Sequence, residues 1–379
     1  MSQQLSVYVH IPFCRWCCPY CAFYSLDTAG DQEIAAYPRL LLRELDLKAQ
    51  DWRGLSLKSI YFGGGTPSLL SPETVGSIIE AIEDIYPAET DREITLEANP
   101  GTVNQYTIEE FHQAGVNRFS IGVQAFDEDR LNFLGRIHDL QEIDAALKAV
   151  KSLPDVTLSI DLMSGIPSET TETWDRELDQ LFAHDPDGIS FYSLTVEEGT
   201  KLAERMIRGE AVHLPADETV SLLLHAAQRM SQQGYLHYEV SNWAKPGKEC
   251  RQNQHYWQRG LYLGLGPSAH SFDGKQRVWN RPDLTSYRQA LEKGDAPPYQ
   301  SELLTDENHR SEWVYLKLRQ SDGLDYSDYQ DLFGAPPHYW TVMFKKITET
   351  GLGDFDGQRF KPNDRGLLLA DEISARILG

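Results

Sequence analysis

Hydrophobic and polar residues follow two alternating patterns along the first half of the chain. Short apolar or alternating runs predict six strands, and stretches with helical spacing separate them. The strands are expected at 5–11, 57–62, 93–98, 118–123, 156–163 and 188–195; the helices are expected at 32–49, from 71 onward, at 107–114, 140–151 and 171–183. Strands that alternate with helices are typical of a parallel α/β domain.

The pattern changes after about residue 200. A helix is expected at 217–233 and a short strand at 235–240, followed at 241–282 by an ordered loop region rich in Gly, Trp, Tyr and Asn. A Pro-containing stretch at 294–299 is a candidate linker, and short helices and turns return after about residue 308. We therefore expect three parts: an α/β domain at 1–215, a connecting region at 216–300 and a small, mainly helical C-terminal domain at 301–379.

Composition and charge narrow the class of protein. The chain has 379 residues, of which 41% are hydrophobic and 24% charged, as in globular proteins. Its 35 basic and 57 acidic side chains give a net charge of −22, which argues against binding of nucleic acid or of anionic membranes. The N-terminus Met1-Ser-Gln-Gln has no signal-peptide pattern and no apolar run reaches membrane-spanning length, so a reducing, cytoplasmic compartment is expected.

Four of the five cysteines lie within eight residues, directly after the first expected strand. Cys14, Cys18 and Cys21 have the spacing C-x3-C-x2-C, which offers three thiolates from one loop. Three thiolates hold a [4Fe–4S] cluster while one iron stays open to a small molecule. A zinc site with His10 as fourth ligand is the main alternative, whereas Cys17, adjacent to Cys18, is expected to be a packed thiol.

Further polar and glycine residues stand at or after the later strands. Gly63-Gly64-Gly65-Thr66-Pro67 follows the second strand, and glycines there let a ligand approach the backbone. Glu97, Gln124 and Asp161 stand near the ends of later strands, and Arg136 follows the fourth strand. An acid, an amide and a guanidinium together suit a ligand that bears an amine, a carboxylate and a ribose.

These motifs resemble the radical S-adenosylmethionine (SAM) superfamily. The segment Tyr8-Val-His-Ile-Pro before the cysteines is similar to the group of oxygen-independent coproporphyrinogen III oxidases and their relatives. Later segments agree with that group: Leu96-Glu-Ala-Asn-Pro100, Gly122-Val-Gln124, Asp161-Leu-Met-Ser-Gly-Ile-Pro167 and Tyr262-Leu-Gly-Leu-Gly-Pro-Ser-Ala-His-Ser271. The resemblance covers the chain from about residue 5 to its C-terminus.

The resemblance implies a partial (βα)6 barrel, open on one side, with the C-terminal domain as a lid. It implies that Cys14, Cys18 and Cys21 hold the cluster and that the open iron chelates the amine and carboxylate of SAM. The implied SAM-site residues are Tyr8, Gly64, Gly65, Thr66, Glu97, Gln124, Arg136 and Asp161.

Two branches of this group differ beside the cluster. The oxidase branch has a further cysteine two positions after the third ligand, where this chain has Phe23. The chain thus resembles the HemW-type heme chaperones, whose His-Asn-x-x-Tyr-Trp signature carries a histidine implicated in heme binding. Here the segment reads Gln252-Asn-Gln-His-Tyr-Trp257, with Gln252 at the histidine position. An amide is a very poor ligand for heme iron.

Replacement ligands for heme are available nearby in the sequence. His255 lies three residues after Gln252, and Cys250 lies two residues before it. We take these two residues as the candidate heme ligands, with His237 and His270 as weaker candidates.

Three functional hypotheses remain. The first is a heme chaperone that binds the cluster, SAM and heme or a porphyrin and passes heme to a recipient hemoprotein. The second is a radical SAM enzyme with an electron donor as partner, either a coproporphyrinogen-oxidising decarboxylase or a methyltransferase or cyclopropanase of the same group. The third is a zinc-stabilised α/β binding protein.

Overall fold

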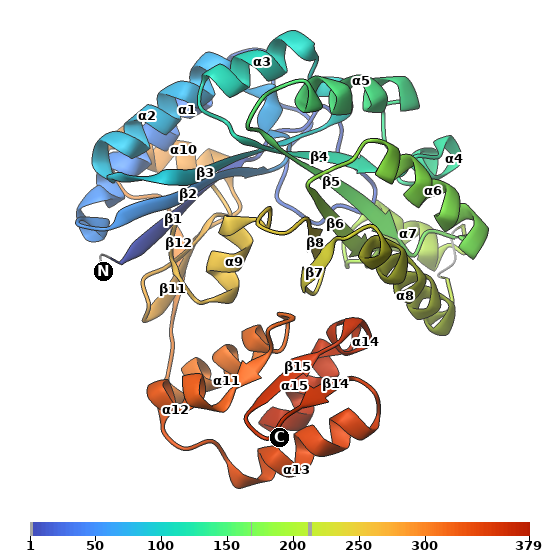
Figure 1. Ribbon diagram of the computed structural model, residues 1–379. Helices are drawn as coiled ribbons and strands as arrows, with labels where there is room; N and C mark the ends of the chain where they lie inside the picture. The colour runs from blue at the N-terminus through green and yellow to red at the C-terminus, as the bar shows by residue number, and fades with distance from the viewer. Residues whose placement is uncertain (1–2, 168, 211–213) are drawn as a thin grey trace.

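The computed structural model describes residues 3–167, 169–210 and 214–379. Two stretches on which sequence-based expectations depend lie outside the described residues. They are Met1 and Ser2 of the N-terminal segment and residues 211–213, just before the expected boundary at 215. Twelve of the strands in the described residues form one curved sheet, whose strand order is β12-β11-β10-β9-β1-β2-β3-β4-β5-β6-β8-β7. Because the end strands β12 and β7 do not pair with each other, the sheet is an open, partial barrel (Figure 1).

Six neighbouring parallel strands form the centre of this sheet, as the sequence predicts. They are β1 (Gln4–Ile11), β2 (Ser56–Gly64), β3 (Ala88–Ala98), β4 (Arg118–Gln124), β5 (Thr157–Ser164) and β6 (Gly188–Ser193). Parallel strands joined by helices bring their C-terminal ends to one rim of the barrel, which is where the motif residues are expected.

Helices cover the outer face of the sheet, and the C-terminal part of the chain lies at its open side (Figure 1). The α-helices of this layer are α1 (Asp31–Lys48), α2 (Pro72–Ile85), α3 (Gln105–Gln113), α4 (Glu128–Phe133), α5 (Leu140–Lys151), α6 (Thr171–Ala183), α7 (Lys201–Ile207), α8 (Ala216–Gln232) and α10 (Leu284–Lys293). Single-turn 3-10 helices lie at Ala49–Trp52, Pro67–Leu69 and Pro100–Thr102.

Side-chain hydrogen bonds to the backbone determine where several of these helices begin. Ser71 accepts a hydrogen bond from the backbone of Thr74, with Pro72 at the first helical position of α2. Thr170 forms a reciprocal capping box with Thr173 at the start of α6. Such short-range contacts explain why these helices were predicted within one or two residues.

The region at 241–282 differs from the expected loop region, because four of its segments are strands that extend the main sheet. It contains β8 (Asn242–Ala244), α9 (Arg251–Trp257), β9 (Leu261–Leu265), β10 (His270–Phe272) and β11 (Gln276–Asn280); β7 (Leu236–Glu239) and β12 (Tyr299–Leu303) flank it. Strand β9 pairs in parallel with β1, about 250 residues away in sequence. The candidate linker at 294–299 ends at the start of β12.

The C-terminal part is built around its own apolar cluster, which includes Trp313, Trp340, Phe344 and Phe360. Its helices are α11 (Asp306–Lys317), α12 (Tyr326–Phe333), α13 (His338–Glu349), α14 (Asp364–Leu368) and α15 (Ala370–Leu378), and a small sheet is made of β13 (Leu324–Asp325), β14 (Gly353–Phe355) and β15 (Arg359–Pro362). This separate core lies within the segment expected as the C-terminal domain, whose boundary at residue 301 stays a prediction and falls inside β12 of the main sheet.

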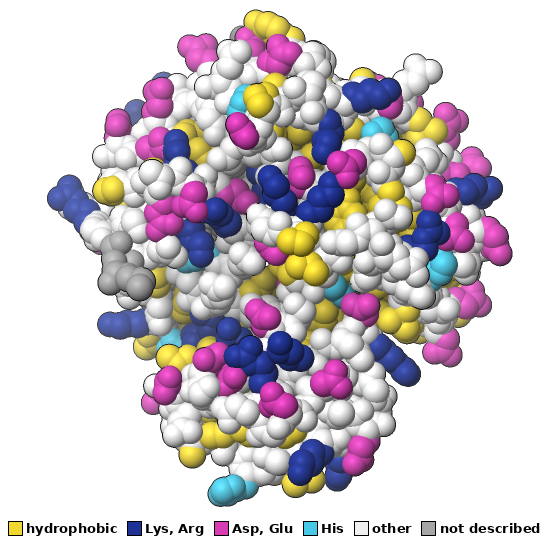
Figure 2. Space-filling view, viewed as in Figure 1, with side chains coloured by type: hydrophobic (Ala, Val, Ile, Leu, Met, Phe, Trp, Pro, Cys, Tyr) yellow, Lys and Arg dark blue, Asp and Glu magenta, His cyan; other side chains and the backbone are white. Residues whose placement is uncertain are grey.

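Two surface properties complete the description. Within the described ranges, no helix combines the length and apolarity needed to cross a bilayer. Figure 2 shows acidic and basic side chains interspersed over the face in view, with basic side chains gathered along the boundary between the barrel and the C-terminal domain.

Candidate functional site

The cysteine loop leaves β1 and lies over the rim of the barrel. Cys14, Cys18 and Cys21 are partly exposed and are not joined in disulfides. The Thr66 hydroxyl donates to Cys14 Sγ at 3.6 Å, and Arg136 Nη1 donates to Cys18 Sγ at 3.3 Å. Hydrogen bonds from neutral and cationic donors stabilise sulfur ligands in their thiolate form. Cys17, by contrast, contacts Ser25, with 3.4 Å between its Sγ and the serine Oγ.

The glycines after β2 allow the next segment to approach this loop closely. Gly64 has φ of +112°, a conformation that side-chain-bearing residues rarely adopt. A Cβ placed on Gly65 would lie 2.5 Å from the Phe13 carbonyl oxygen and 3.0 Å from Cys14 Sγ. A larger residue at position 65 would therefore displace the cysteine loop.

Glu97 at the end of β3 is a half-buried carboxylate that faces this glycine segment. It accepts hydrogen bonds from the Tyr61 hydroxyl at 2.8 Å and from the Gly64 backbone nitrogen at 3.2 Å. Burial raises the pKa of Glu97 to about 7, because the charged form loses its hydration. Glu97 can therefore change its charge near neutral pH.

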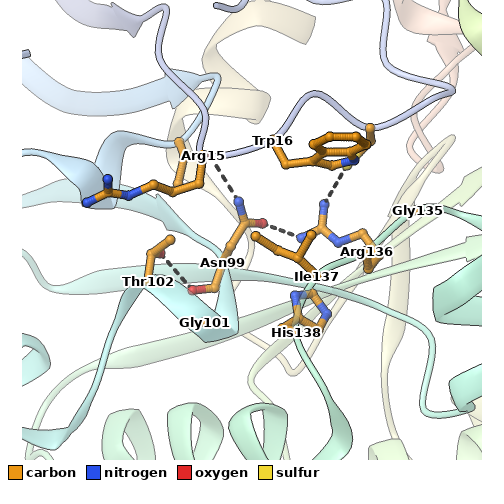
Figure 3. Close-up of a pocket in the computed structure, with 11 residues that line it drawn as sticks. Arg15, Trp16, Asn99, Gly101, Thr102, Gly135, Arg136, Ile137 and His138 are labelled. Carbon is orange, nitrogen blue, oxygen red and sulfur yellow. Dashed lines mark hydrogen bonds between the residues drawn. The ribbon is translucent and has the colours of Figure 1, made fainter. Parts of the chain in front are cut away.

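Arg136 connects the cysteine loop to the strand ends. Its Nη2 donates to the Gly122 carbonyl at 2.9 Å and also contacts Asn99, and Figure 3 shows Arg136 and Asn99 pointing toward each other beneath the loop that carries Trp16. The Asn99 amide in turn donates to Thr66 at 3.0 Å. Arg136 Nε is buried and has no hydrogen-bond partner among the described residues. These contacts surround a small pocket of about 30 Å³ beside Cys18.

Next to this pocket lies a larger cavity of about 580 Å³, which we call the cysteine cavity. It is lined by all three predicted cluster ligands and by seven of the eight predicted SAM-site residues: Gly64, Gly65, Thr66, Glu97, Gln124, Arg136 and Asp161. Gln124 ends β4 with φ of +70°, a strained conformation for this residue type that is common at functional sites. Asn99, Ser120 and Tyr192 also line the cavity and were not predicted, although Asn99 stands in the quoted Leu-Glu-Ala-Asn-Pro motif.

Asp161 is the second half-buried carboxylate of the cysteine cavity. It accepts a hydrogen bond from the Ser120 hydroxyl at 3.0 Å, and burial raises its pKa to about 6. Neither Asp161 nor Glu97 forms an ion pair within the described part of the chain. Two half-buried carboxylates without an ion-pair partner favour a ligand that carries positive charge.

Tyr8, the remaining predicted SAM-site residue, lies in a different place. It lines a second cavity of about 790 Å³, and its hydroxyl lies 3.2 Å from His10 Nδ1. The other ring nitrogen of His10 lies 2.9 Å from the Tyr24 carbonyl oxygen. Both nitrogens of His10 are thus occupied, which removes the fourth ligand on which the zinc alternative depends.

The second cavity is largely aromatic, and we call it the aromatic cavity. Its lining includes Tyr8, Phe23, Tyr24, Tyr192, Tyr256, Trp257, Tyr262, His270, Arg277 and Leu316. It shares Ala22, Phe23 and Tyr192 with the cysteine cavity, so the two cavities adjoin. Phe23, whose exposed fraction is 73%, lies at this junction. Volumes of 300–1,000 Å³ are usual for small-molecule and cofactor sites.

Gln252, where a histidine was expected, lies in the core and does not line the aromatic cavity. Its Oε1 accepts from the Ser59 hydroxyl at 2.6 Å, and its Nε2 donates to the Tyr256 hydroxyl at 2.7 Å. Ser59 in turn lies 2.7 Å from Ser6, between their hydroxyl oxygens. Gln252 therefore holds Tyr256, which does line the cavity, in a fixed orientation.

The candidate heme ligands Cys250 and His255 also lie outside the lining of the aromatic cavity. The Cys250 thiol is buried 3.4 Å from Glu93 Oε1, and burial raises its pKa. His255 Nε2 lies 2.7 Å from the Leu261 carbonyl oxygen, and a Cβ on Gly260 would overlap the ring. Both side chains are packed against neighbouring backbone or side chains, so the geometry does not favour either as a ligand of iron in this cavity. Of the weaker candidates, His270 lines the cavity and His237 does not.

Comparisons with known proteins place this architecture in a family. Residues 8–181 match the profile of the radical SAM superfamily, and residues 304–369 match that of the HemN C-terminal domain. The chain is 33% identical over 381 residues to the heme chaperone HemW of Mycobacterium tuberculosis, an alignment that covers 100% of this chain and 96% of the relative. The chain belongs to the HemW family of radical SAM proteins.

Two further likenesses agree with HemW-family membership. The heme chaperone HemW of Escherichia coli is 39% identical over 267 residues, which cover 70% of this chain and 69% of the relative. The solved structure of coproporphyrinogen III oxidase (HemN) from Escherichia coli superposes with a TM-score of 0.86 at 24% identity, over 99% of this chain and 90% of that one, which shows a shared fold.

Membership of the radical SAM superfamily implies a [4Fe–4S] cluster and SAM as cofactors. The cysteine cavity fits both groups. Its three thiol-bearing loop residues receive hydrogen bonds at two sulfurs, its glycine segment has no side chains, and its two carboxylates lack a cation. The cluster, when bound and reduced, supplies an electron that can cleave SAM.

Proposed function

We propose that this protein is a heme chaperone, which binds a [4Fe–4S] cluster, SAM and heme and delivers the heme to a recipient hemoprotein. The observation that carries the proposal is the pair of adjoining cavities, which share Ala22, Phe23 and Tyr192. One cavity has the residue types that the two cofactors need, and the other has the volume and aromatic lining that a planar porphyrin needs.

Residue roles in the cysteine cavity are part of this proposal. Cys14, Cys18 and Cys21 hold the cluster, with Arg136 and Thr66 donating to two of the sulfurs. Glu97 and Asp161 face the positively charged groups of SAM, while Gly64 and Gly65 leave room for its approach. Gln124 and Tyr8 complete the set, and Tyr8 acts from the side of the aromatic cavity.

Phe23 supports the chaperone over the porphyrinogen-oxidising alternative. It stands at the junction of the two cavities, where the oxidase branch has a further cysteine. An apolar, exposed aromatic side chain offers a surface on which a porphyrin can stack, and it has no ligand atom for iron. A reducing, cytoplasmic setting belongs to the proposal and is supported by the five free cysteines.

Heme titration of the purified protein tests the proposal. After anaerobic reconstitution of the cluster, hemin is added stepwise and followed by absorption, and gel filtration then separates bound from free heme. We expect a shifted Soret band that saturates near one heme per chain, and transfer of this heme to an apo-hemoprotein. No spectral change and no heme retained at stoichiometric addition would refute the chaperone role.

A second incubation separates the chaperone from the radical enzyme. The reconstituted protein is mixed anaerobically with dithionite, SAM and coproporphyrinogen III, and the products are analysed by chromatography. We expect no divinyl product. Formation of the divinyl product over several turnovers would place the protein with the oxidases. The protein would then need an electron donor as a partner.

A further inference from the structure

The aromatic cavity contains one histidine whose ring is free to bind a metal. Of the histidines that the structure describes, His10 and His270 line this cavity. Both ring nitrogens of His10 are occupied, by the Tyr8 hydroxyl at 3.2 Å and the Tyr24 carbonyl oxygen at 2.9 Å. Neither ring nitrogen of His270 has a hydrogen-bond or ion-pair partner among the described residues, and its side chain is exposed to the cavity.

The remaining lining residues offer poorer ligands for iron. No cysteine and no methionine is found among the described residues that line the aromatic cavity. Five tyrosines do line it, but burial raises the pKa of each hydroxyl, which disfavours the phenolate that binds iron. Glu239 is committed to Asn242, which donates to its carboxylate.

His270 is also held in place by its surroundings. Its ring stacks on Trp279 with 5.5 Å between ring centroids and 15° between ring planes. Its backbone lies against Gly264, where a Cβ would come within 2.2 Å of the His270 carbonyl oxygen. The next residue, Ser271, accepts a hydrogen bond from the Gly264 nitrogen at 2.9 Å. A ligand fixed in this way loses little freedom on binding.

The charge state of the ring suits coordination. Partial desolvation, and next the neighbouring positive charge of Arg277, lower the pKa of His270. The imidazole is therefore neutral near pH 7, and its free nitrogen lone pair can bind iron.

A guanidinium in the wall of the same cavity fits a carboxylate of heme. Arg277 lines the cavity and pairs with Glu312, and Arg259 pairs with the same carboxylate at 2.8 Å. Two guanidiniums thus share one acidic partner. Glu302 stands opposite Arg277 on β12 but forms no ion pair with it among the described residues. Arginine is a suitable partner for a propionate carboxylate.

We propose that His270 is the axial ligand of heme iron in this protein, with heme bound in the aromatic cavity and a propionate beside Arg277. This inference rests on the proposed heme-chaperone function. It assigns the iron ligand to His270 and not to position 252, where the family histidine is expected. The buried Gln252 then serves to position Tyr256 in the cavity wall.

The variant His270→Ala tests the ligand directly. Wild type and variant are reconstituted with the cluster and titrated with hemin, with absorption and electron paramagnetic resonance as readouts. We expect the variant to bind heme at least tenfold more weakly and with a shifted Soret band. Free imidazole is expected to restore the wild-type spectrum, a rescue that a purely structural role of His270 would not show.

Three control variants accompany this experiment. His338→Ala removes an exposed histidine on α13, and Cys250→Ala and His255→Gln remove the two other candidate ligands. All three are expected to keep the wild-type heme spectrum, and iron and sulfide analysis checks that each variant keeps its cluster.

The outcomes separate the two proposals. An unchanged spectrum and affinity in His270→Ala would overturn the ligand assignment while leaving the chaperone function intact, and so would a loss that imidazole cannot restore. If the wild-type protein binds no heme, the proposed function fails and this inference fails with it.

Discussion

Two kinds of sulfur environment occur in the cysteine loop. Cys14 and Cys18 receive hydrogen bonds from Thr66 and Arg136, whereas Cys17 turns to Ser25. The adjacent Cys17 and Cys18 therefore have different surroundings although they are chemically identical. This difference leads to the first prediction.

Replacing Cys14, Cys18 or Cys21 by Ala is expected to abolish the cluster, because each substitution removes one of only three thiolates. Cys17→Ala is the matched control and is expected to keep it. Iron and sulfide content after anaerobic reconstitution, together with visible absorption, measures both results. An intact cluster in any of the first three variants would show that the ligand assignment is wrong.

The half-buried carboxylate of Glu97 is expected to make SAM binding dependent on pH. Its folded-state pKa of about 7 lies above the ordinary value of 4.5. The ionised form attracts the positively charged groups of SAM, so affinity should rise about tenfold between about pH 6 and pH 8. Calorimetric titration with SAM at several pH values measures this, and Glu97→Gln should flatten the profile. A wild-type affinity that is independent of pH would contradict the prediction.

The same ionisation has the opposite effect on the ligand-free fold. Because the folded pKa is raised, the contribution of Glu97 to the free energy of unfolding is complete below about pH 4.5 and is lost as the pH rises to about 7. SAM binding and ligand-free stability therefore favour opposite protonation states of one side chain.

At the scale of elements, the glycine segment after β2 determines how closely the cysteine loop approaches the barrel. Gly65→Ala would place a Cβ 2.5 Å from the backbone oxygen of Phe13, which cannot move without the loop. We expect a loss of about 1–3 kcal/mol in the free energy of unfolding and a lower cluster content. Chemical denaturation and iron analysis measure these effects.

Gly30→Ala is the control for this substitution. No atom lies within 4 Å of a Cβ placed at Gly30, and its φ of −82° is open to any residue. Its unfolding free energy is expected to change by less than about 1 kcal/mol. A Gly65→Ala variant as stable as this control, with a full cluster, would contradict the steric argument.

Helices and strands with a clear local sequence pattern were predicted well. Strands that form only by pairing with segments far away in the sequence were not predicted. Helix α6 begins at a capping box and was predicted at its observed bounds, 171–183. Strands β9, β10 and β11 were missed because they are short and rich in Gly and aromatic residues. They become strands by pairing with one another and with β1, a contact that no local pattern reveals.

At the scale of the whole molecule, Glu312 joins the C-terminal domain to the barrel. Its carboxylate on α11 pairs with Arg259 and with Arg277 on β11, and these side chains are only 14–24% exposed. The Gln320 side chain adds a bond to the Trp257 carbonyl at 3.1 Å. Leu316, also on α11, lines the aromatic cavity. Docking of this domain therefore completes one wall of the proposed heme site.

Glu312→Gln is expected to weaken this docking, because it leaves two guanidiniums close together without a carboxylate. The free energy of unfolding should fall by about 1–3 kcal/mol, and amide hydrogen exchange in α11 should increase. Asp331→Asn, which changes an exposed acidic residue on α12, is the control and should alter neither. Equal exchange in both variants would show that the ion pairs do not hold the domain.

The amino-acid sequence by itself determined the alternating strands and helices, the three-cysteine loop and the polar residues near the strand ends. These signals lie within a few residues of each other, so periodicity, capping and spacing reveal them. Only the tertiary structure decided which side chains share a cavity. It placed Tyr8 in the aromatic cavity, buried Gln252, Cys250 and His255 outside its lining, and left the ring of His270 free within it. The reason is physical: a side chain becomes available to a ligand only when packing leaves its polar atoms unsatisfied, and packing joins strands that lie far apart in the sequence.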